Sequence, residues 1–477
     1  MTGDSIRIDE KDNVAVTLTG TDTIPAGHKF ALTPIRKGEF VIKYGQIIGR
    51  ATEDIPKGAW VHTHNMRSHL DESVSYSYHY AASEPERETG TFLGYLREDG
   101  SVGIRNEIFI LPTVGCVNGA AMRMARAMQA EVGEGLDGVY ALTHQFGCSQ
   151  LGEDAENIRK LIVSIACHPN AAFVLLVGLG CENNALAPIL DELSALGRTN
   201  VCGFNCQEVE DEQEYGLSIL RGFAEKARAM HRTEVSLEKL KIGVKCGGSD
   251  GYSGITANPT VGKISDRVVA LGGAAVLTEV PEMFGAETIL MNRCANEELF
   301  HQTVDLINDF KNYFKSHNQT IYENPSPGNK KGGISTLEDK SLGCTQKSGS
   351  ALVKGVLQYG DTVKTPGLNL LSAPGNDLVA ATALAAAGAH IVLFTTGRGT
   401  PFASPVPTMK IATNSRLAGK KSNWIDFNAG VLVEDKTMEE ETKALFDLVV
   451  ETASGKQVCS EAAGFHDMAI FKQGVTL

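Results

Sequence analysis

The chain has 477 residues, of which 42% are hydrophobic and 21% are charged, and a formal net charge of −13 at pH 7. This length allows several domains whose apolar cores need no disulfide bonds for stability. The acidic balance argues against nucleic acid or an anionic membrane as a partner, because both select surfaces rich in lysine and arginine. It still allows a small anionic substrate, which needs only a few basic residues inside a pocket.

No apolar run reaches the roughly 18 residues of a membrane helix. The opening stretch MTGDSIRIDEKDNVAV is polar and acidic, unlike a secretory signal. The ten cysteines are therefore predicted to be reduced thiols or metal ligands and not disulfides. We expect a cytoplasmic protein.

Residues 1–70 are predicted to form a small β module, because short β-rich runs alternate with the turn sequences IPAGH, RKGE and IPKGA. Residues 71–91 are polar and are predicted to be a solvated linker. In residues 92–235, apolar strands alternate with helices, which is typical of a Rossmann-like domain with a parallel sheet covered on both faces. The dinucleotide fingerprint is incomplete in GLGCEN, residues 178–183, so a nicotinamide cofactor is not expected.

Residues 236–477 mix strand-like, helix-like and glycine-rich stretches and are predicted to be a C-terminal α/β domain. A glycine-rich polar block from 324 to 350 interrupts this domain and is too poor in apolar residues to be core. Long loops of this kind are usually functional or mobile. The predicted fold class is therefore multidomain α/β.

The first three predicted strands of the middle domain each lead to a Gly-Cys pair, at Cys116, Cys148 and Cys181. Ligands of open parallel sheets bind outside the carboxyl ends of the strands. Neighbouring strands lie about 5 Å apart. Thiols that follow the carboxyl ends of three adjacent strands, here called strand exits, could therefore converge on one metal site. Three thiolates suit iron or zinc, as a mononuclear ion or as a three-cysteine iron–sulfur cluster with one open iron. The alternative is that these cysteines only pack beneath the loops.

Other candidate side chains are expected at this edge of the sheet or in the β module. Glu182 follows the third exit cysteine and is a candidate acid or a partner that orients a metal ligand. His144 precedes the second exit, with a core histidine as the alternative. His62 and His64, in WVHTHN, alternate along a predicted strand and would share one face, which suits a metal pair or acid–base chemistry. His28 lies in the turn PAGHKF, where the alternative is an exposed surface residue.

A set of basic residues could hold an anionic substrate. Arg398, in TTGRGTP, follows a predicted strand among glycines, where backbone NH groups can also face an anion. Lys330, Lys331 and Lys347 lie in the glycine-rich block. For Lys330 and Lys331 the alternative is a solvated surface position.

Seven long motifs follow one another along the chain: GYLREDGSVGIRNEIFILPTVGC, THQFGCSQ, GLGCENN, KCGGSDGYSGITANP, NPSPGNKKGG, LGCTQKSG and FTTGRGTP. Through these motifs the chain resembles the altronate/galactarate dehydratase family over essentially its whole length. The resemblance implies a β-clip (SAF-like) module fused to a Rossmann-like domain and a less common α/β domain. It implies dehydration of a sugar acid in hexuronate breakdown, D-altronate to 2-keto-3-deoxy-D-gluconate, with a divalent metal, iron especially and Mn²⁺ as a further candidate. The HTHN pair favours altronate-type over galactarate-type chains.

Such a reaction removes a weakly acidic proton from C2 and the hydroxyl from C3, so the enediolate intermediate needs a metal or cationic residues nearby. We predict that the β module supplies His28 or the His62/His64 pair from across a cleft, and that Arg398 and Lys347 hold the carboxylate. The alternatives are galactarate or another aldonate or aldarate as the substrate, sulfite elimination as in the related sulfolactate lyases, and a sugar-acid-binding protein without catalysis. We expect a homo-oligomer.

Overall fold

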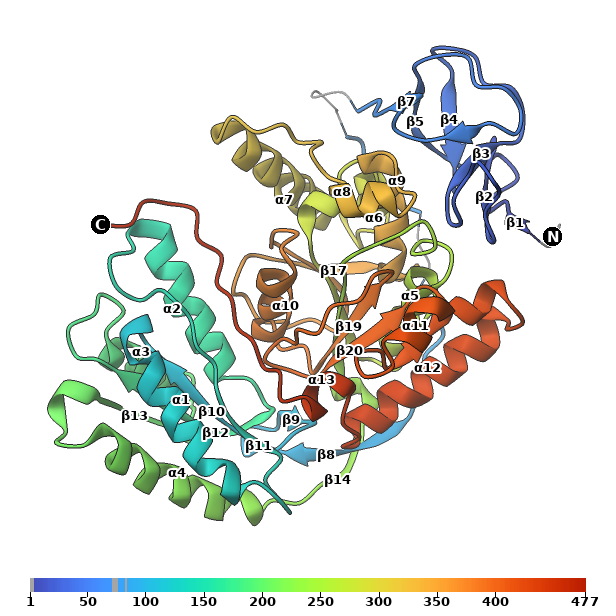
Figure 1. Cartoon of the computed structure of the whole chain (residues 1–477). Coiled ribbons are helices and arrows are strands. Elements are labelled where there is room, and N and C mark those ends of the chain that lie inside the picture. Colours follow the sequence, from blue (N-terminus) through green and yellow to red (C-terminus); the bar gives the residue numbers. More distant parts are fainter. Residues whose placement is uncertain (1–3, 71–75, 82–83) are drawn as a thin grey trace.

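The computed structural model of the chain describes residues 4–70, 76–81 and 84–477. They form an N-terminal β module, a middle domain and a C-terminal domain, in the order of the chain (Figure 1). In this view the β module and the middle domain lie on opposite sides of the C-terminal domain (Figure 1). The multidomain α/β architecture predicted from the sequence is confirmed.

The β module consists of two small antiparallel sheets, ordered β1-β2-β3-β6 and β4-β5-β7, that share one apolar core. The predicted turns are present: Gly27, Gly38 and Gly58 have φ angles of 80°, 88° and 81°, a region that favours glycine. The strands are β1 (Ser5–Ile6), β2 (Val14–Thr17), β3 (Lys29–Ala31), β4 (Phe40–Lys43), β5 (Gln46–Ala51), β6 (Trp60–Val61) and β7 (Met66–Arg67).

The strand predicted through His62 and His64 ends earlier, at Val61. Asn65 closes a turn there: its side-chain oxygen accepts from the His62 backbone NH (3.0 Å), and its amide donates to the Trp60 carbonyl (2.8 Å). His62 is buried in this turn, whereas His64 is exposed. The two rings therefore do not share one face of a strand, and that prediction is wrong.

The predicted linker is only partly described. Residues 84–89 are exposed, but Tyr76 and Tyr78 are half-buried and attached to the C-terminal domain. The Tyr76 hydroxyl donates to Glu287 Oε1 (2.6 Å), and the Tyr78 hydroxyl donates to the Cys294 carbonyl (2.6 Å). Both rings pack against the apolar core of the C-terminal domain. The expectation of a wholly solvated linker is corrected, because two aromatic residues attach this segment to the domain that follows.

The middle domain is a four-stranded parallel sheet in the order β11-β10-β12-β13. All residues of β12 are buried, as expected where helices cover both faces of the sheet. Its strands are β10 (Glu107–Pro112), β11 (Gly138–Ala141), β12 (Ala171–Gly178) and β13 (Val201–Asn205). Its helices are α1 (Asn118–Ala127), α2 (Gly152–Ala166), α3 (Leu186–Ala195) and α4 (Glu212–Arg228). A small antiparallel sheet, β14-β8-β9, flanks the domain with β8 (Thr91–Leu96), β9 (Val102–Gly103) and β14 (Thr233–Ser236).

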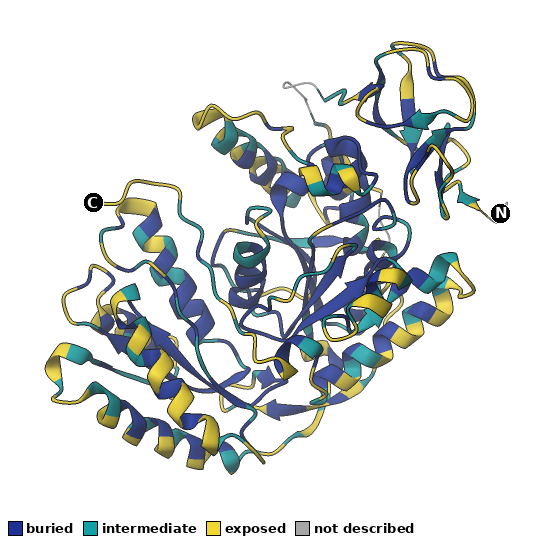
Figure 2. Ribbon diagram, in the orientation of Figure 1, coloured by how far each residue is buried: buried dark blue, intermediate teal, exposed yellow. Residues whose placement is uncertain are grey.

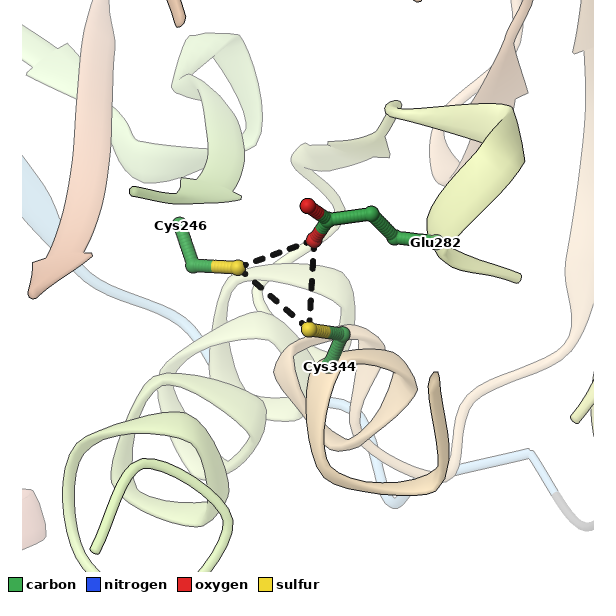
Figure 3. A group of neighbouring side chains, drawn as sticks. All are labelled: Cys246, Glu282 and Cys344. Carbon is green, nitrogen blue, oxygen red and sulfur yellow. Dashed lines mark hydrogen bonds between the residues drawn. The ribbon is translucent and has the colours of Figure 1, made fainter. Parts of the chain in front are cut away.

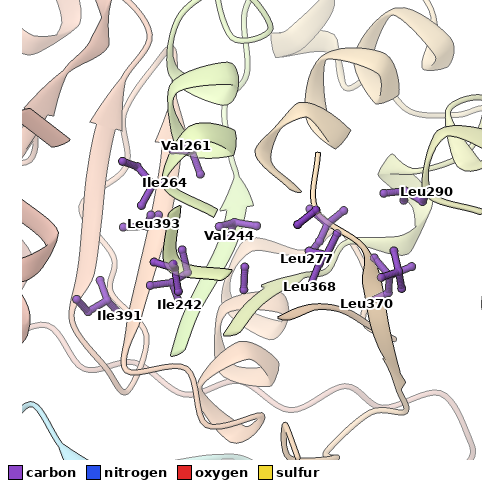
Figure 4. Packing of buried hydrophobic residues seen from close by; sticks show 14 of the residues in the cluster. Ile242, Val244, Val261, Ile264, Leu277, Leu290, Leu368, Leu370, Ile391 and Leu393 are labelled. Carbon is purple, nitrogen blue, oxygen red and sulfur yellow. The ribbon is translucent and has the colours of Figure 1, made fainter. Parts of the chain in front are cut away.

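The C-terminal domain is built on a seven-stranded parallel sheet in the order β17-β18-β16-β15-β19-β20-β21. Branched side chains of α5 cover one face, where Val261 and Ile264 lie over Val244 and Leu393 (Figure 4). The strands are β15 (Lys241–Cys246), β16 (Ala274–Leu277), β17 (Val353–Leu357), β18 (Gly367–Leu371), β19 (Ile391–Thr396), β20 (Thr408–Ala412) and β21 (Phe427–Asn428). The helices are α5 (Ala257–Ala270), α6 (Glu287–Met291), α7 (Glu297–Ser316), α8 (Pro327–Lys331), α9 (Leu337–Cys344), α10 (Asp377–Ala386), α11 (Ser415–Lys420), α12 (Met438–Ala453) and α13 (Cys459–Ala462).

The central strands of both parallel sheets are buried, and exposed residues concentrate on the outer faces of the helices (Figure 2). One apolar cluster joins the two large domains, because it contains residues of α2 in the middle domain and of α10 in the C-terminal domain. Among the described residues, no helix combines the length and the apolar character that crossing a membrane requires.

The glycine-rich block from 324 to 350 is not the extended loop that its composition suggested. Ser326 and Asn329 form a capping box at the start of α8, and the Thr336 hydroxyl caps α9. Every residue of α9 is buried, although most of its side chains are polar. The prediction failed because these polar side chains find partners on distant segments, which composition does not reveal.

Candidate active site

A cavity of about 500 Å³ lies at the carboxyl ends of strands β15, β16 and β18 in the C-terminal domain. This is the edge at which open parallel sheets bind ligands, and the volume is within the usual range for small-molecule sites. Aromatic residues of α7 form one side. The loops after the three strands and the segment around α8 and α9 contribute polar groups: Cys246, Glu282, Asn329, Lys340 and Asp377.

Cys246, Glu282 and Cys344 form a compact buried cluster at the inner end of this cavity (Figure 3). The two sulfur atoms are 3.4 Å apart, and Glu282 Oε2 lies 3.1 Å from Cys246 Sγ and 3.2 Å from Cys344 Sγ. Cys246 is the last residue of β15, Glu282 follows β16, and Cys344 ends α9. Three separate elements therefore bring these ligand-type atoms together.

Buried lysines surround the cluster. Lys340 Nζ lies 2.6 Å from Glu282 Oε1, while Lys245 Nζ and Lys347 Nζ lie 3.1 Å and 3.7 Å from the two oxygens of Glu279. Burial alone would lower the pKa of Lys340, but the Glu282 carboxylate raises it above its usual value. Lys340 therefore remains charged, and its ammonium group lies in the cavity wall beside the Glu282 carboxylate.

The thiols and carboxylates of this region are driven to different protonation states. A hydrogen bond with Cys344 lowers the pKa of the Cys246 thiol, and the same contact and burial raise the pKa of Cys344. Burial raises the pKa of Glu279, whereas Lys340 outweighs burial and lowers the pKa of Glu282. Glu279 also has a positive φ of 67°, an uncommon conformation for a residue with a side chain. Pairs of groups with diverging pKa values are typical of functional sites.

The strands that lead to Cys116, Cys148 and Cys181 are neighbours in the sheet order β11-β10-β12, as predicted. All three thiols are exposed. Gly147 and Gly180, which precede two of them, have φ angles of 105° and 120°, so glycine is needed for these tight turns. Among the described residues, these sulfur atoms are not part of a group whose ligand atoms all lie within 4.8 Å of one another. Their common metal site remains a prediction.

Glu182 and His144 both stabilise the backbone at this edge of the sheet through hydrogen bonds. The Glu182 carboxylate accepts from the Thr113 hydroxyl (2.5 Å) and from the backbone NH groups of residues 179 (3.0 Å) and 180 (2.7 Å). Burial opposes the charged carboxylate, but these hydrogen bonds lower the pKa of Glu182 below its usual value. His144 is buried, with Nε2 2.8 Å from the Pro112 carbonyl and Nδ1 accepting from the Phe146 NH (3.2 Å). Both side chains are thus fully used in local structure.

The C-terminal segment connects the strand exits of the middle domain to the cavity. Phe471 lines the cavity, and Thr476 forms a β-bridge with Gln150, two residues after Cys148. Five peptide units span at most about 18 Å. The C-terminal segment therefore runs from the rim of the cavity to the loop that carries Cys148.

The module histidines gather around Trp60 on the face that contacts the segment leading to α9. The rings of His28 and His62 are 5.1 Å apart, and Trp60 stacks on His62 and lies 5.2 Å from His64. His28 Nδ1 accepts from the Trp60 indole NH (3.2 Å), so His28 Nε2 carries the proton that it donates to the Lys331 carbonyl (3.3 Å). Both ring nitrogens of His28 are therefore used: Nδ1 within the β module and Nε2 in the contact with the C-terminal domain.

Among the described residues, His62 is the buried module histidine that keeps one ring nitrogen without a hydrogen bond. Its Nδ1 lies 3.0 Å from Ser335 Oγ, and within the described part of the chain Nε2 makes no hydrogen bond. Burial lowers the pKa of His62 to about 4, so the ring is neutral at pH 7. His64 is exposed at the edge of the same group.

A buried ion triad fixes the β module to α9. Asp339 of α9 accepts from Lys29 Nζ (2.7 Å) and from Lys43 Nζ (3.1 Å), and all three side chains are at most 3% exposed. Lys29 also donates to the Gly333 carbonyl (2.7 Å). Burial opposes the charge on Asp339, but the two lysines hold the pKa of this carboxyl well below its usual range. The residue after Asp339 is Lys340, so the triad also positions the cavity wall.

The predicted substrate-binding residues are dispersed. Arg398 is exposed, with Nη1 donating to the Gly328 carbonyl (3.0 Å). Lys331 is exposed and Lys330 is half-buried on α8, whereas Lys347 is buried beside Glu279, behind the cysteine cluster. None of these four basic side chains lines the cavity.

The sequence prediction missed Cys246, Glu282, Lys340 and Cys344. Cys246 carries the same signal as the three predicted thiols, because β15 also ends at a cysteine followed by glycines, in KIGVKCGG. Lys340 and Cys344 lie in the block predicted to be a loop, and Glu282 has no local signal.

Family models match three consecutive segments of the chain. Residues 17–69 match the altronate/galactarate dehydratase SAF domain. Residues 94–228 match the D-galactarate dehydratase/altronate hydrolase second domain, and residues 237–476 match the D-galactarate/altronate dehydratase C-terminal domain.

Three curated relatives are similar over nearly the full length. The chain is 53% identical to altronate dehydratase of Bacillus subtilis (strain 168), over 97% of this chain and 94% of the relative. It is 52% identical to altronate dehydratase of Escherichia coli (strain K12), over 99% of each chain. It is 32% identical to galactarate dehydratase (L-threo-forming) of the same bacterium, over 98% of this chain and 96% of the relative. From these matches and the shared domain order, the chain belongs to the altronate/galactarate dehydratase family.

Proposed function

We propose that this chain is a hydro-lyase that converts D-altronate to 2-keto-3-deoxy-D-gluconate and water. The observation that carries the proposal is the near-full-length likeness to two altronate dehydratases, at 53% and 52% identity, against 32% for a galactarate dehydratase. The cavity of about 500 Å³ is large enough for a six-carbon acid and combines an apolar side with charged groups.

The charged wall of the cavity suits the chemistry of this reaction. Removing the C2 proton places a second negative charge on the carboxylate end of the substrate. Lys340 lines the cavity and is held by Glu282, so its position is fixed before substrate binds. Such preorganised charges stabilise the developing enediolate without rearrangement during the reaction.

A divalent metal, iron especially, completes the proposal. When bound, such an ion would act as a Lewis acid that assists loss of the C3 hydroxyl. Thiolates fit Fe²⁺ better than Mn²⁺, which prefers oxygen ligands. Cys116, Cys148 and Cys181 remain candidate ligands, either of a single iron ion or of a three-cysteine iron–sulfur cluster.

The proposal is tested by turnover. Anaerobically purified protein supplied with Fe²⁺ is expected to dehydrate D-altronate, with a kcat/KM for galactarate at least about tenfold lower, a difference of about 1.4 kcal/mol in transition-state stabilisation. Exhaustive chelation, with metal removal verified by elemental analysis, is expected to abolish turnover. A protein that binds altronate without releasing product would instead be a sugar-acid-binding protein, and faster turnover of galactarate would reverse the substrate assignment.

We further propose that His62 transfers the substrate proton. His62 does not itself line the cavity, so this role requires the substrate to extend from the cavity toward the β module. His62→Asn is expected to lower kcat about 10²-fold, within the usual contribution of a general base. Because the pKa of His62 is lowered to about 4 by burial, the base stays unprotonated above that pH, and the acid limb of the pH–kcat profile should lie near pH 4. His64→Asn, at the exposed edge of the same group, serves as the matched comparison and should change kcat less than about threefold. A larger loss in His64→Asn would assign proton transfer to His64.

A further inference from the structure

We propose that Cys246, Glu282 and Cys344 bind one divalent metal ion, with an open coordination position that faces the cavity. The cluster is the one group in the described part of the chain whose three ligand-type atoms all lie within 4.8 Å of one another. Cys246 and Glu282 also line the cavity, so an ion held between them would be within reach of a ligand bound there.

The distances fit coordination by two sulfur atoms and one oxygen. A tetrahedral ion with metal–sulfur and metal–oxygen distances of about 2.3 and 2.1 Å separates its sulfur atoms by about 3.8 Å and sulfur from oxygen by about 3.6 Å. The observed separations are 3.4 Å between the sulfurs and 3.1 Å and 3.2 Å from sulfur to Glu282 Oε2. An outward movement of a few tenths of an ångström at each atom, within ordinary side-chain motion, would admit the ion.

The orientation of Glu282 matches that of a metal-binding carboxylate. Its Oε1 is held by Lys340 at 2.6 Å, which leaves Oε2 directed at the two sulfur atoms (Figure 3). Metal-binding carboxylates are commonly oriented by a hydrogen bond to the second oxygen. Lys340 would therefore position the ligand and the substrate at once.

Two thiolates and one carboxylate select Fe²⁺ or Zn²⁺ over Mn²⁺ or Mg²⁺. Three protein ligands with an open fourth position are typical of catalytic and not of structural sites. The open position would bind an oxygen of the sugar acid, and this part of the inference rests on the proposed function. Metal binding itself is measured without substrate, so either idea can fail while the other stands.

The test is spectroscopic and uses the full chain. Metal-free protein is titrated anaerobically with Co²⁺, and wild type is expected to show a thiolate-to-cobalt charge-transfer band that saturates at one ion. Cys246→Ser and Cys344→Ser should each lose this band and weaken Co²⁺ binding more than about tenfold, as expected when a ligand is replaced by a poorer one. Cys294→Ser, which changes a buried thiol outside the cluster, is the matched control and should keep the band.

X-ray absorption of wild-type protein loaded with one equivalent of Zn²⁺ avoids any folding defect of the variants. We expect two sulfur ligands at about 2.3 Å and lighter ligands at about 2.0 Å. Three sulfur ligands would point to the strand-exit cysteines instead and overturn the proposal. So would an unchanged charge-transfer band in the Cys246→Ser/Cys344→Ser double variant, or a Cys246–Cys344 disulfide detected by mass spectrometry in protein kept anaerobic.

Discussion

Replacing Asp339 with asparagine is expected to loosen the β module from α9 and to remove most of the dehydratase activity. The substitution keeps the shape of the side chain but leaves Lys29 and Lys43 buried without a counter-charge. Breaking a buried ion pair by removing one partner costs about 3–5 kcal/mol. Because α9 also carries Lys340 and Cys344, the same change should disturb the cavity wall.

This effect is measured by thermal unfolding and by altronate turnover in parallel. The first thermal unfolding transition of Asp339→Asn should have a midpoint several degrees below that of wild type. The kcat/KM for altronate should be reduced in the same variant. Asp305→Asn, an exposed position on α7, is the matched control and should match wild type. A Lys29→Met/Lys43→Met/Asp339→Leu variant, which removes all three charges, should regain much of the lost stability, since no buried charge is left unpaired. Wild-type behaviour of Asp339→Asn would contradict the buried triad.

The triad also predicts a pH dependence with a defined sign. The lysines depress the pKa of Asp339 in the folded protein below its unfolded value of 3.8. Its contribution to stability is therefore present above pH 3.8 and is lost as the pH falls through the lower, folded pKa. In Asp339→Asn this acid-dependent loss should be absent, which urea unfolding at a series of pH values would measure.

Replacing Lys340 with methionine is expected to lower kcat/KM for altronate by about 10²- to 10³-fold, the usual cost of removing one preorganised charge that faces the transition state. Lys340 Nζ contacts Glu282 Oε1 (2.6 Å), Asn324 Oδ1 (3.0 Å) and Asn329 Oδ1 (3.3 Å). Its ammonium group is therefore fixed in the wall of the cavity. Most of the loss should appear in kcat if Lys340 stabilises the enediolate, and in KM if it only binds the carboxylate.

Two further variants separate catalysis from stability at this position. Lys340→Met leaves Glu282 without its cation, so the double variant Lys340→Met/Glu282→Gln should be more stable than the single one and no more active. Lys443→Met, at an exposed position on α12, is the matched control and should retain wild-type kinetics. A near-normal kcat/KM in Lys340→Met would move the substrate away from this cavity, and the strand exits of the middle domain would become the next site to test.

The layered architecture of the two large domains could be predicted because its signals are local. The eight residues of β12 are apolar and buried throughout, and the turns at Gly147 and Gly180 have φ angles that favour glycine. Alternation of such strands with amphipathic helices specifies a parallel sheet, and its carboxyl edge follows from the direction of the chain. The three exit cysteines were placed on neighbouring strands for the same reason.

The candidate site could be predicted only in part. Cys246 has a recognisable local pattern, because β15 ends at a cysteine followed by glycine, as the strands of the middle domain lead to Gly-Cys pairs. The strand expected through His62 and His64 was broken by Asn65, whose side chain competes with the backbone for hydrogen bonds. The segment around α9 resembled a loop because its residues are polar, and nothing in its composition shows that Asp339 is paired.

The sequence by itself determined the order of the three parts, the parallel sheets and the family. Only the tertiary structure decided that α9 is a buried helix, that Lys29 and Lys43 reach Asp339 across about 300 residues of chain, and that Cys246, Glu282 and Cys344 meet in one place. These contacts depend on how separate elements pack against one another. A residue's type and its neighbours in the chain fix local conformation, but a buried charge or thiol is stabilised by whichever distant group the fold brings beside it.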